Sequence, residues 1–314
     1  MKLEKTLILG SNGFVGQNME EFIKTHHEES LDSYVFHKGK NELDIKDASQ
    51  LSKYLKKHKP EVIVNLTAFV GGISYGYEFP AKILHENSTM ILNLFEEARI
   101  NGVRKIVSPI SNCAYPGDIN FYTEEKFWEG KPHESVFNYA FSRRLSVAMS
   151  ISYLKQYNFN SSSVVLSNMY GKYDHFEEKR SHALGAIVNK IYEAKVKQKK
   201  EVSIWGTGKP IREWLYVEDG VKALLKSTKL GSGHHFFNVG VNKGISIKDL
   251  SEKIANIIGW HGVFKFDLTK PDGALEKRVD GKNMLEKLSW EPETSLDDGL
   301  LKTIDWYVRK KTNI

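Results

Sequence analysis

The 314-residue sequence predicts an α/β protein in which a doubly wound parallel sheet carries a smaller α/β lobe. Three observations lead to this prediction. Short apolar runs alternate with helical spacing through the first half of the chain, and a glycine-rich turn joins the first run to the first helix. After about residue 169 the predicted segments become shorter and more varied. Strands that alternate with helices favour a parallel sheet with right-handed crossovers.

The first strand and the turn after it are the most informative stretch of the chain. The apolar run 7–9 is typical of a parallel strand that is covered on both faces. Gly10, Gly13 and Gly16 follow, and then a helical pattern begins. Without side chains the backbone can approach a pyrophosphate, and the helix N-terminus directs free N–H groups at it. This spacing is related to the dinucleotide fingerprint, so we predict a Rossmann-type dinucleotide-binding domain.

The other strands and helices follow from the same two patterns. In the sheet domain we expect strands at 33–37, 61–66, 103–107 and 162–166, and helices at 48–57, 80–100 and 135–157. Beyond residue 169 we expect strands at 202–205, 214–217 and 236–239, and helices at 182–195, 218–227, 247–258 and 296–309. The predicted dinucleotide domain comprises residues 1–168 with roughly 212–240, and the substrate lobe comprises 169–211 and 241–314.

The end of the second strand selects the cofactor in such folds. An acidic residue there binds the ribose 2′-hydroxyl of NAD, whereas basic residues accept the 2′-phosphate of NADP. This chain reads His37-Lys38-Gly39-Lys40, with no acid before Glu42. We therefore predict NADP(H). The alternative is that Lys38 and Lys40 are ordinary loop lysines.

The predicted cofactor contacts follow the carboxyl ends of the strands, where open parallel sheets bind their ligands. Each contact lies either on a loop that follows one of the first strands or on the helix that carries Tyr139. The expected contacts are Gly10, Asn12, Gly13, Phe14, Val15, Gly16, His37, Lys38, Asp44, Ile45, Leu66, Thr67, Ala68, Tyr139 and Arg143.

Polar side chains suited to catalysis follow the fourth strand and open the next helices. Ser111 and Cys113 come after that strand, Tyr139 and Arg143 lie one helical turn apart, and His182 stands near the start of the second lobe. A tyrosine beside a fixed positive charge has a lowered phenol pKa, which suits proton transfer to or from a sugar oxygen. Each of these residues, taken singly, also has an ordinary role in packing or on the surface.

Composition excludes several classes of function. The net charge is +6 and the pI about 9.0, but the lysines are spread along helices and loops, so we expect no nucleic-acid partner. No apolar run approaches membrane-spanning length and the N-terminus leads straight into the first strand, so we expect a cytoplasmic protein without a membrane segment. The single cysteine, Cys113, excludes an internal disulfide.

A set of short motifs then follows in order along the chain: GSNGFVG at 10–16, FVGGI at 69–73, SNCAYP at 111–116, Tyr139, NMYG at 168–171, SHALGAI at 181–187, WGTGKPIREWLYVED at 205–219, FNVG at 237–240 and KPDG at 270–273. With these motifs the sequence resembles the extended short-chain dehydrogenase/reductases nearly from end to end. Within that family it resembles the GDP-4-keto-6-deoxymannose 3,5-epimerase/4-reductases, the GDP-L-fucose synthases.

The resemblance implies roles for individual residues. It matches Ser111 and Tyr139 with the catalytic serine and tyrosine, and Cys113 and His182 with the acid/base pair of epimerisation. A 4-ketone acidifies the protons at C3 and C5, and a thiol with an imidazole suits their removal and return. Reduction follows when the nicotinamide delivers hydride to C4 and Tyr139 protonates the oxygen.

The resemblance also implies contacts with a nucleotide-sugar substrate, which we expect to be GDP-linked. Asn168 and Trp205 are matched with positions near the sugar, and Arg212 and Lys277 with groups that contact the diphosphate.

Two helices, 80–100 and 135–157, are expected to form a four-helix bundle in a homodimer. The alternative is that they only cover the sheet.

Two residues depart from the family pattern. Arg143 stands where the family has a lysine that holds the nicotinamide ribose and polarises the tyrosine. Arginine keeps the charge but is larger and planar. Lys172 follows NMYG where a proline is usual.

Three functions remain open from the sequence. The first is an NADPH-dependent epimerase/reductase of a GDP-4-keto-6-deoxy sugar. The second is a C4-reductase alone, for another GDP-4-keto sugar such as a 6-deoxyheptose. The third is a non-catalytic nucleotide-binding protein.

Overall fold

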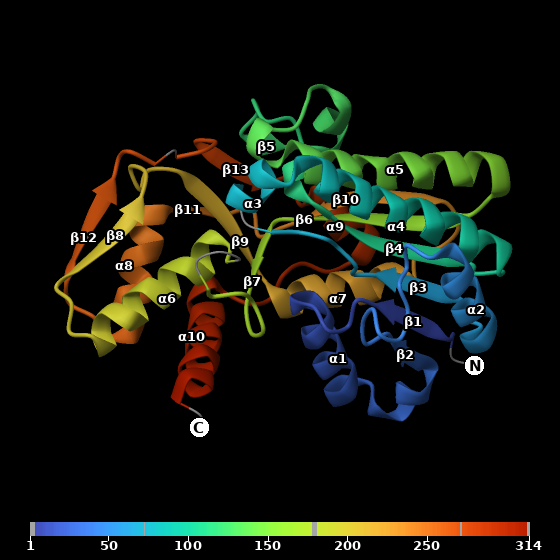
Figure 1. Cartoon of the computed structure of the whole chain (residues 1–314), viewed down its shortest axis with the longest axis horizontal. Coiled ribbons are helices and arrows are strands. Elements are labelled where there is room, and N and C mark those ends of the chain that lie inside the picture. Colours follow the sequence, from blue (N-terminus) through green and yellow to red (C-terminus); the bar gives the residue numbers. More distant parts are fainter. Residues whose placement is uncertain (1–3, 72, 178–180, 271, 313–314) are drawn as a thin grey trace.

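A six-stranded parallel sheet organises one half of the molecule (Figure 1). The computed structural model describes residues 4–71, 73–177, 181–270 and 272–312, and for residues 73 and 74 the backbone alone. Across the sheet the strands are β10 (His234–Val239), β6 (Asn160–Leu166), β4 (Lys105–Ser111), β3 (Val62–Asn65), β1 (Thr6–Leu9) and β2 (Tyr34–Phe36). The chain moves from β1 outward to β2 and then crosses back to β3, so a topological switch point lies at the end of β1.

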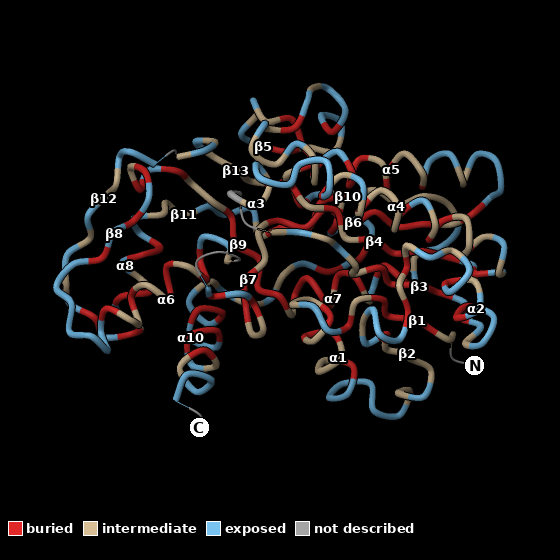
Figure 2. Tube along the Cα trace, in the orientation of Figure 1, coloured by how far each residue is buried: buried red, intermediate tan, exposed pale blue. Residues whose placement is uncertain are grey.

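Helices cover both faces of this sheet. On one face α4 (Pro80–Ile100) packs against α5 (Phe137–Tyr157), with α2 (Ala48–His58) beside α4. On the other face α1 (Phe14–His26) packs against α7 (Val217–Thr228). Alternate residues of β1 separate accordingly, because Leu7 and Leu9 join the apolar cluster under α4 whereas Ile8 joins the cluster under α1. Figure 2 shows buried residues concentrated on these strands and on the inner sides of the helices.

Helix α4 illustrates why the sequence signals were sufficient for long elements. Pro80 occupies the first turn, where its missing N–H costs nothing, and Gly102 follows the helix with a positive φ of 75°. Helix α4 therefore has the predicted bounds, and so does α8 (Ile247–Ile258). Strand β4 differs from the predicted 103–107, because residues 108–111 continue to pair with β6 through and beyond Pro109.

A second, mixed sheet joins the two halves of the molecule. Its central strand is β9 (Ile211–Tyr216), which pairs with three strands drawn from distant parts of the chain. These are β7 (Asn168–Tyr170), β11 (Gly244–Ser246) and β13 (Glu276–Val279), and β13 pairs in turn with β5 (Phe121–Tyr122). The sheet therefore places side chains from the substrate lobe beside a segment that follows β4.

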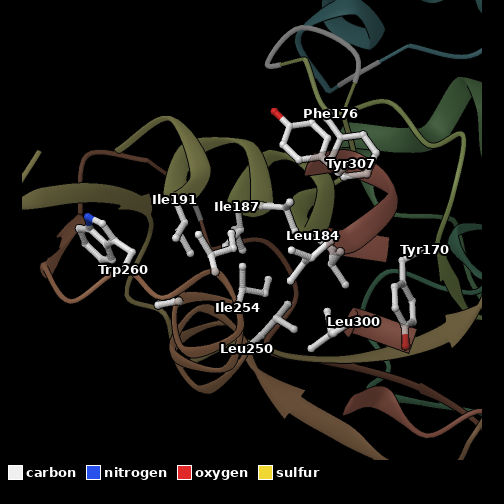
Figure 3. Close-up of a cluster of buried hydrophobic side chains, with 14 of the residues drawn as sticks. Tyr170, Phe176, Leu184, Ile187, Ile191, Leu250, Ile254, Trp260, Leu300 and Tyr307 are labelled. Atoms are coloured by element: carbon white, nitrogen blue, oxygen red, sulfur yellow. The ribbon is translucent and has the colours of Figure 1, made fainter. Parts of the chain in front are cut away.

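The smaller lobe has its own core. The parallel pair β8 (Glu201–Trp205) and β12 (Val263–Asp267) packs with α6 (Ala183–Val196), α8 and α10 (Leu296–Thr312). Figure 3 shows Leu184, Ile187 and Ile191 of α6 facing Leu250 and Ile254 of α8. Two short helices complete the fold: α3 (Ile73–Glu78) packs near α4, and α9 (Lys282–Leu288) packs on β10. Within the described ranges, no helix is long and apolar enough to cross a membrane.

Candidate active site

The glycine loop after β1 is held tightly by its own backbone. Gly10 has a positive φ of 82°, and a Cβ there would come within 3.0 Å of the backbone of Leu66, just after β3. A Cβ at Gly16 would overlap the carbonyl oxygen of Gly10 and the backbone of Ser11. Gly13 caps α1 with extended backbone and no side-chain hydrogen bond. The first N–H groups of α1 therefore remain available to an anion.

The end of β2 supports this loop through its backbone and one buried ring. The Ser11 hydroxyl donates to the carbonyl of His37 at 2.6 Å, and the Asn12 amide donates to the carbonyl of Lys38. The His37 ring is buried, and its Nε2 lies 2.9 Å from the carbonyl of Gly39. The His37 ring therefore hydrogen-bonds to backbone groups. The exposed Lys38 is the basic side chain at the strand end, and its amino group pairs with Glu20 of α1.

The segments after β2 and β3 approach the same end of the sheet. Leu66 donates its N–H to the carbonyl of Leu9 at 2.9 Å, and the Thr67 hydroxyl donates to Asn65 Oδ1 at 2.6 Å. Ala68 is exposed beyond them. The Asp44–Ile45 turn is anchored where the Asn93 amide of α4 donates to the Ile45 carbonyl at 3.2 Å.

Ser111 and Cys113 come together at the carboxyl end of β4. Ser111 is the last residue of the strand, and its hydroxyl accepts the N–H of Cys113 at 3.3 Å in a short 3-10 turn. Cys113 is half-buried. Burial raises the pKa of its thiol, and the Ser111 hydroxyl and the charges of Lys277 and Arg143 act against that rise. The thiol thus lies within the electrostatic range of both cations.

Tyr139 and Arg143 occupy the first turns of α5. The Arg143 guanidinium lies over the Tyr139 ring, 5.1 Å from its centroid, and is only 3% exposed. Its Nη2 donates to Oδ1 of Asn87 on α4 at 3.0 Å. Burial raises the pKa of Tyr139, whereas the Arg143 charge lowers it. The negative charge of a Cys113 thiolate would raise it further, which places the phenol and the thiol in one site.

Two further cations reach the same point from the second sheet. Lys277 of β13 pairs in register with Arg212 of β9. Burial lowers the pKa of Lys277, as does the neighbouring Arg212, whereas Cys113 raises it. The Arg212 guanidinium donates from Nη1 to the carbonyl of Ile211 at 2.8 Å and from Nη2 to the carbonyl of Asp272 at 3.3 Å. Arg143 and Lys277 therefore both act on the thiol, Arg143 also acts on the phenol, and Arg212 lies beside Lys277.

The comparisons with known proteins agree with this architecture. Residues 6–240 match the model of the NAD dependent epimerase/dehydratase family. The chain belongs to this family. A GDP-L-colitose synthase from Yersinia pseudotuberculosis is 32% identical over 98% of this chain and 99% of its own length. GDP-L-fucose synthase 1 from Arabidopsis thaliana is 30% identical over 99% of this chain and 95% of its own.

A solved structure from Campylobacter jejuni, a GDP-mannoheptose C4 reductase with NADP bound, has the same fold. Its TM-score is 0.85 at 24% identity, and the match covers 98% of this chain and 99% of that one. The predicted Rossmann-type fold with its parallel sheet is confirmed.

A dinucleotide of the kind this family uses fits the residues present. The loop 10–16 forms a cradle that side chains would fill, and the helix behind it offers unpaired N–H groups. On the other side of the site, Nε of Arg143 is buried and has no partner among the described residues. A ribose hydroxyl of such a dinucleotide would supply the acceptor that this donor lacks.

Three of the predicted site residues lie apart from the cluster. His182 is exposed at the N-cap of α6. It lies near the buried Asp174, where it lowers the pKa of the carboxyl against the effect of burial. Among the described residues there is no interaction between His182 and Cys113. The Asn168 amide donates to the carbonyl of Glu213 at 2.8 Å, which ties β7 to β9. Trp205 is 53% exposed, with Lys190 and Lys270 over its ring.

Sequence reasoning missed several residues that support the site. Asn87 holds Arg143 and also bonds both backbone groups of Phe69, so it connects α4, α5 and the loop after β3. The pKa of the buried Tyr122 phenol responds to Cys113 and to Arg212, which places Tyr122 between them. A buried asparagine on a helix and a two-residue strand carry no motif, so neither could be found by spacing.

Proposed function

We propose that the protein is an NADPH-dependent epimerase/reductase that acts on a GDP-4-keto-6-deoxy sugar. One observation carries the proposal: a thiol, a phenol and three cations from four separate segments converge on one site of a dinucleotide-binding fold. The names of the curated relatives, which describe synthases of GDP-fucose and GDP-colitose, support the same substrate class. The solved relative that holds NADP supports the cofactor.

The residues of the chain divide the reduction between them. When bound, the cofactor supplies a hydride to the C4 carbon of the ketone. Tyr139 donates its phenolic proton to the C4 oxygen, and the hydroxyl of Ser111 holds that oxygen by a hydrogen bond. Arg143 lies over the Tyr139 ring and stabilises the phenolate that remains. The free Nε of Arg143 binds a hydroxyl of the nicotinamide ribose.

Epimerisation uses the protons that the 4-ketone acidifies. Cys113 removes or returns a proton at C3 or C5 from one face of the sugar ring, and His182 serves the opposite face. Lys277 and Arg143 favour the thiolate form of Cys113 against the effect of burial. His182 is exposed, so this step requires its side chain to turn toward the sugar.

The nucleotide half of the substrate binds the second sheet. Arg212 and Lys277 lie on adjacent strands, and their charges match a diphosphate. Asn168 and Trp205 flank the sugar and the approach to it. Residues 1–168 with roughly 212–240 form the domain that holds the cofactor and contributes Asn168 and Arg212 to the substrate site, and residues 169–211 and 241–314 form the nucleotide-sugar lobe.

A reductase without epimerase activity is the second candidate. The position of His182 favours it, because the described residues place Asp174 rather than Cys113 within reach of the imidazole charge. In that case the substrate is a GDP-4-keto sugar, such as a 6-deoxyheptose, whose neighbouring centres already have their final configuration.

The assembly we propose is a cytoplasmic homodimer formed through α4 and α5. The two helices pack side by side and carry exposed apolar side chains, among them Leu92, which is 46% exposed, and Ile151, which is 47% exposed. A second copy would cover these side chains in a four-helix bundle.

The direct test of the function is consumption of NADPH. Purified protein is mixed with GDP-, dTDP- and UDP-linked 4-keto sugars, and the products are identified by NMR. We expect stoichiometric NADPH oxidation with GDP-4-keto-6-deoxymannose and little with the other nucleotides. Binding of the GDP-sugar without NADPH oxidation would favour a non-catalytic nucleotide-binding protein. Oxidation with inversion of neither C3 nor C5 would favour the pure reductase.

A further inference from the structure

Glu213 is a buried carboxylate next to the proposed diphosphate site, and no step described so far uses it. It follows Arg212 on β9, so the two side chains leave opposite faces of the strand. Its carboxylate accepts three backbone N–H groups. Asn242 donates to Oε1 at 2.8 Å, Val241 donates to the same oxygen, and Val279 donates to Oε2 at 2.8 Å. Glu213 is fully buried.

These hydrogen bonds continue a strand pairing that would otherwise stop. Strands β9 and β13 are in register only from Ile211 with Glu276 to Arg212 with Lys277. Beyond that pair, the N–H of Val279 is taken by the side chain of Glu213 instead of by the backbone of β9. The carboxylate therefore fixes β13 against β9 immediately after the two cations.

The same carboxylate connects these strands to the large sheet. Val241 and Asn242 follow the carboxyl end of β10, and Gly240 passes so close that a Cβ there would overlap Oε1 of Glu213. The Asn242 side chain in turn accepts the N–H of Gly281 at 3.0 Å, which ties the end of β13 to the same loop. Three segments thus meet at one side chain.

We propose that Glu213 is a positioning residue for the substrate diphosphate: by joining β9, β13 and the loop after β10, its carboxylate holds Arg212 and Lys277 side by side and fixes them relative to the large sheet. The inference rests on the proposed function only in assigning the diphosphate to Arg212 and Lys277. It adds that the geometry of this pair depends on an ionised group that never touches the ligand.

The sign of the effect separates positioning from simple electrostatics. A carboxylate close to an anion site repels the anion, so its protonation or removal strengthens binding if it acts only through its field. If it acts by holding the cations in place, protonation or removal weakens binding. Burial raises the pKa of Glu213 to about 7, and Arg278 of β13 is the charged side chain that acts on it. The protonated form is therefore accessible under mild conditions.

The first measurement uses the unmodified protein. The Kd of GDP-mannose, whose diphosphate diester has a constant charge near neutrality, is measured by calorimetry from about pH 8 to about pH 6, and we expect it to rise about fivefold. The neighbouring Lys277 cannot produce this result, because burial lowers its pKa and it loses charge only as the pH rises. A Kd that falls or stays constant over this range would overturn the proposal.

Variants then identify the group responsible. In Glu213→Gln the Kd should be about fivefold weaker at high pH and nearly independent of pH. Gly240→Ala, which presses on the same carboxylate, should change the Kd in the same direction. Glu276→Gln is the matched control, because it removes a carboxylate of β13 that pairs with Arg278 and leaves the three backbone bonds intact. Tighter binding in Glu213→Gln would also contradict the proposal.

A last variant separates this inference from the proposed function. Arg212→Met should weaken GDP-mannose binding if the diphosphate lies on β9. If Arg212→Met has no effect, the assignment of the diphosphate fails. If Arg212→Met weakens binding while Glu213→Gln does not, the assignment stands and the positioning role of Glu213 fails. Thermal unfolding of each variant confirms that the folded protein is being compared.

Discussion

Arg143 is the residue on which the proposed reduction step depends most. It stands where the family resemblance predicts a lysine, and it is buried between the Tyr139 ring and Asn87. Guanidinium remains protonated at any working pH, so its field on the phenol is constant. Because burial raises the pKa of Tyr139 and Arg143 opposes this rise, the cation sets the upper pH limit of proton donation.

Replacement of Arg143 by Met should therefore reduce kcat for reduction by about a hundredfold or more. It should also move the alkaline limb of the pH–rate profile to higher pH, because the phenol loses the cation that lowers its pKa. Arg143→Lys should restore part of both properties. Arg99→Met is the control, since Arg99 pairs with Glu96 on the same face of α4 and lies outside the site. An alkaline limb at the same pH in Arg143→Met would contradict this role.

Cofactor preference is a second property of single residues. Lys38 is the exposed basic side chain that follows β2, and its amino group pairs with Glu20 of α1. We predict that NADPH is preferred over NADH and that Lys38→Ala lowers the ratio of the two kcat/KM values about tenfold, as expected for loss of one charge-assisted bond. Lys24→Ala removes the other partner of Glu20 and should leave the ratio unchanged. Equal kcat/KM for both cofactors in the wild type would refute the prediction.

Among the elements, long helices and central strands could be predicted from the sequence, whereas short strands could not. Helix α8 has strong apolar periodicity, and α4 has clear ends at Pro80 and before Gly102. Strand β5 has two residues and β13 is largely polar, so neither contains a local pattern. Strand β13 forms because it pairs with β9 across more than sixty residues of sequence, and β5 forms because it pairs with β13. The positions of Arg212 and Lys277 relative to Cys113 therefore depend on tertiary pairing, and only the family resemblance anticipated their role.

The glycine loop is an element whose geometry was predictable and can be tested. Gly16→Ala should abolish NADPH binding and lower the free energy of unfolding by about 2 kcal/mol, because the new Cβ would overlap the carbonyl of Gly10. Gly231→Ala is a matched control, since a Cβ there meets nothing within 4 Å. Calorimetric titration with NADPH and chemical denaturation measure the two effects. Normal NADPH affinity in Gly16→Ala would show that the loop is not the pyrophosphate site.

At the scale of the whole molecule, a homodimer through α4 and α5 is the prediction that concerns assembly. The double variant Leu92→Glu with Ile151→Glu places charges on the exposed apolar surface of both helices. In sedimentation velocity experiments, this variant should sediment as a monomer, whereas the wild type should sediment as a dimer. Leu301→Glu on α10, a residue 53% exposed, should leave the dimer intact. A monomeric wild type would mean that the helices only cover the sheet.

The large sheet carries Ser111 and the proposed cofactor loop, whereas the second sheet carries Arg212 and Lys277, the cations proposed to bind the substrate. We therefore expect proton exchange and reduction to occur on one bound sugar. In D₂O without NADPH, the protein should introduce deuterium at C3 and C5 of GDP-4-keto-6-deoxymannose, and Cys113→Ser should abolish this exchange while leaving NADPH binding unchanged.

NMR of the product formed in D₂O after one equivalent of NADPH is added tests the claim most directly. We predict deuterium at C3 and C5, protium from NADPH at C4, and one NADPH oxidised for each product molecule. Protium at all three carbons would leave a reductase alone, and a substrate recovered unchanged with its NADPH unoxidised would contradict the account.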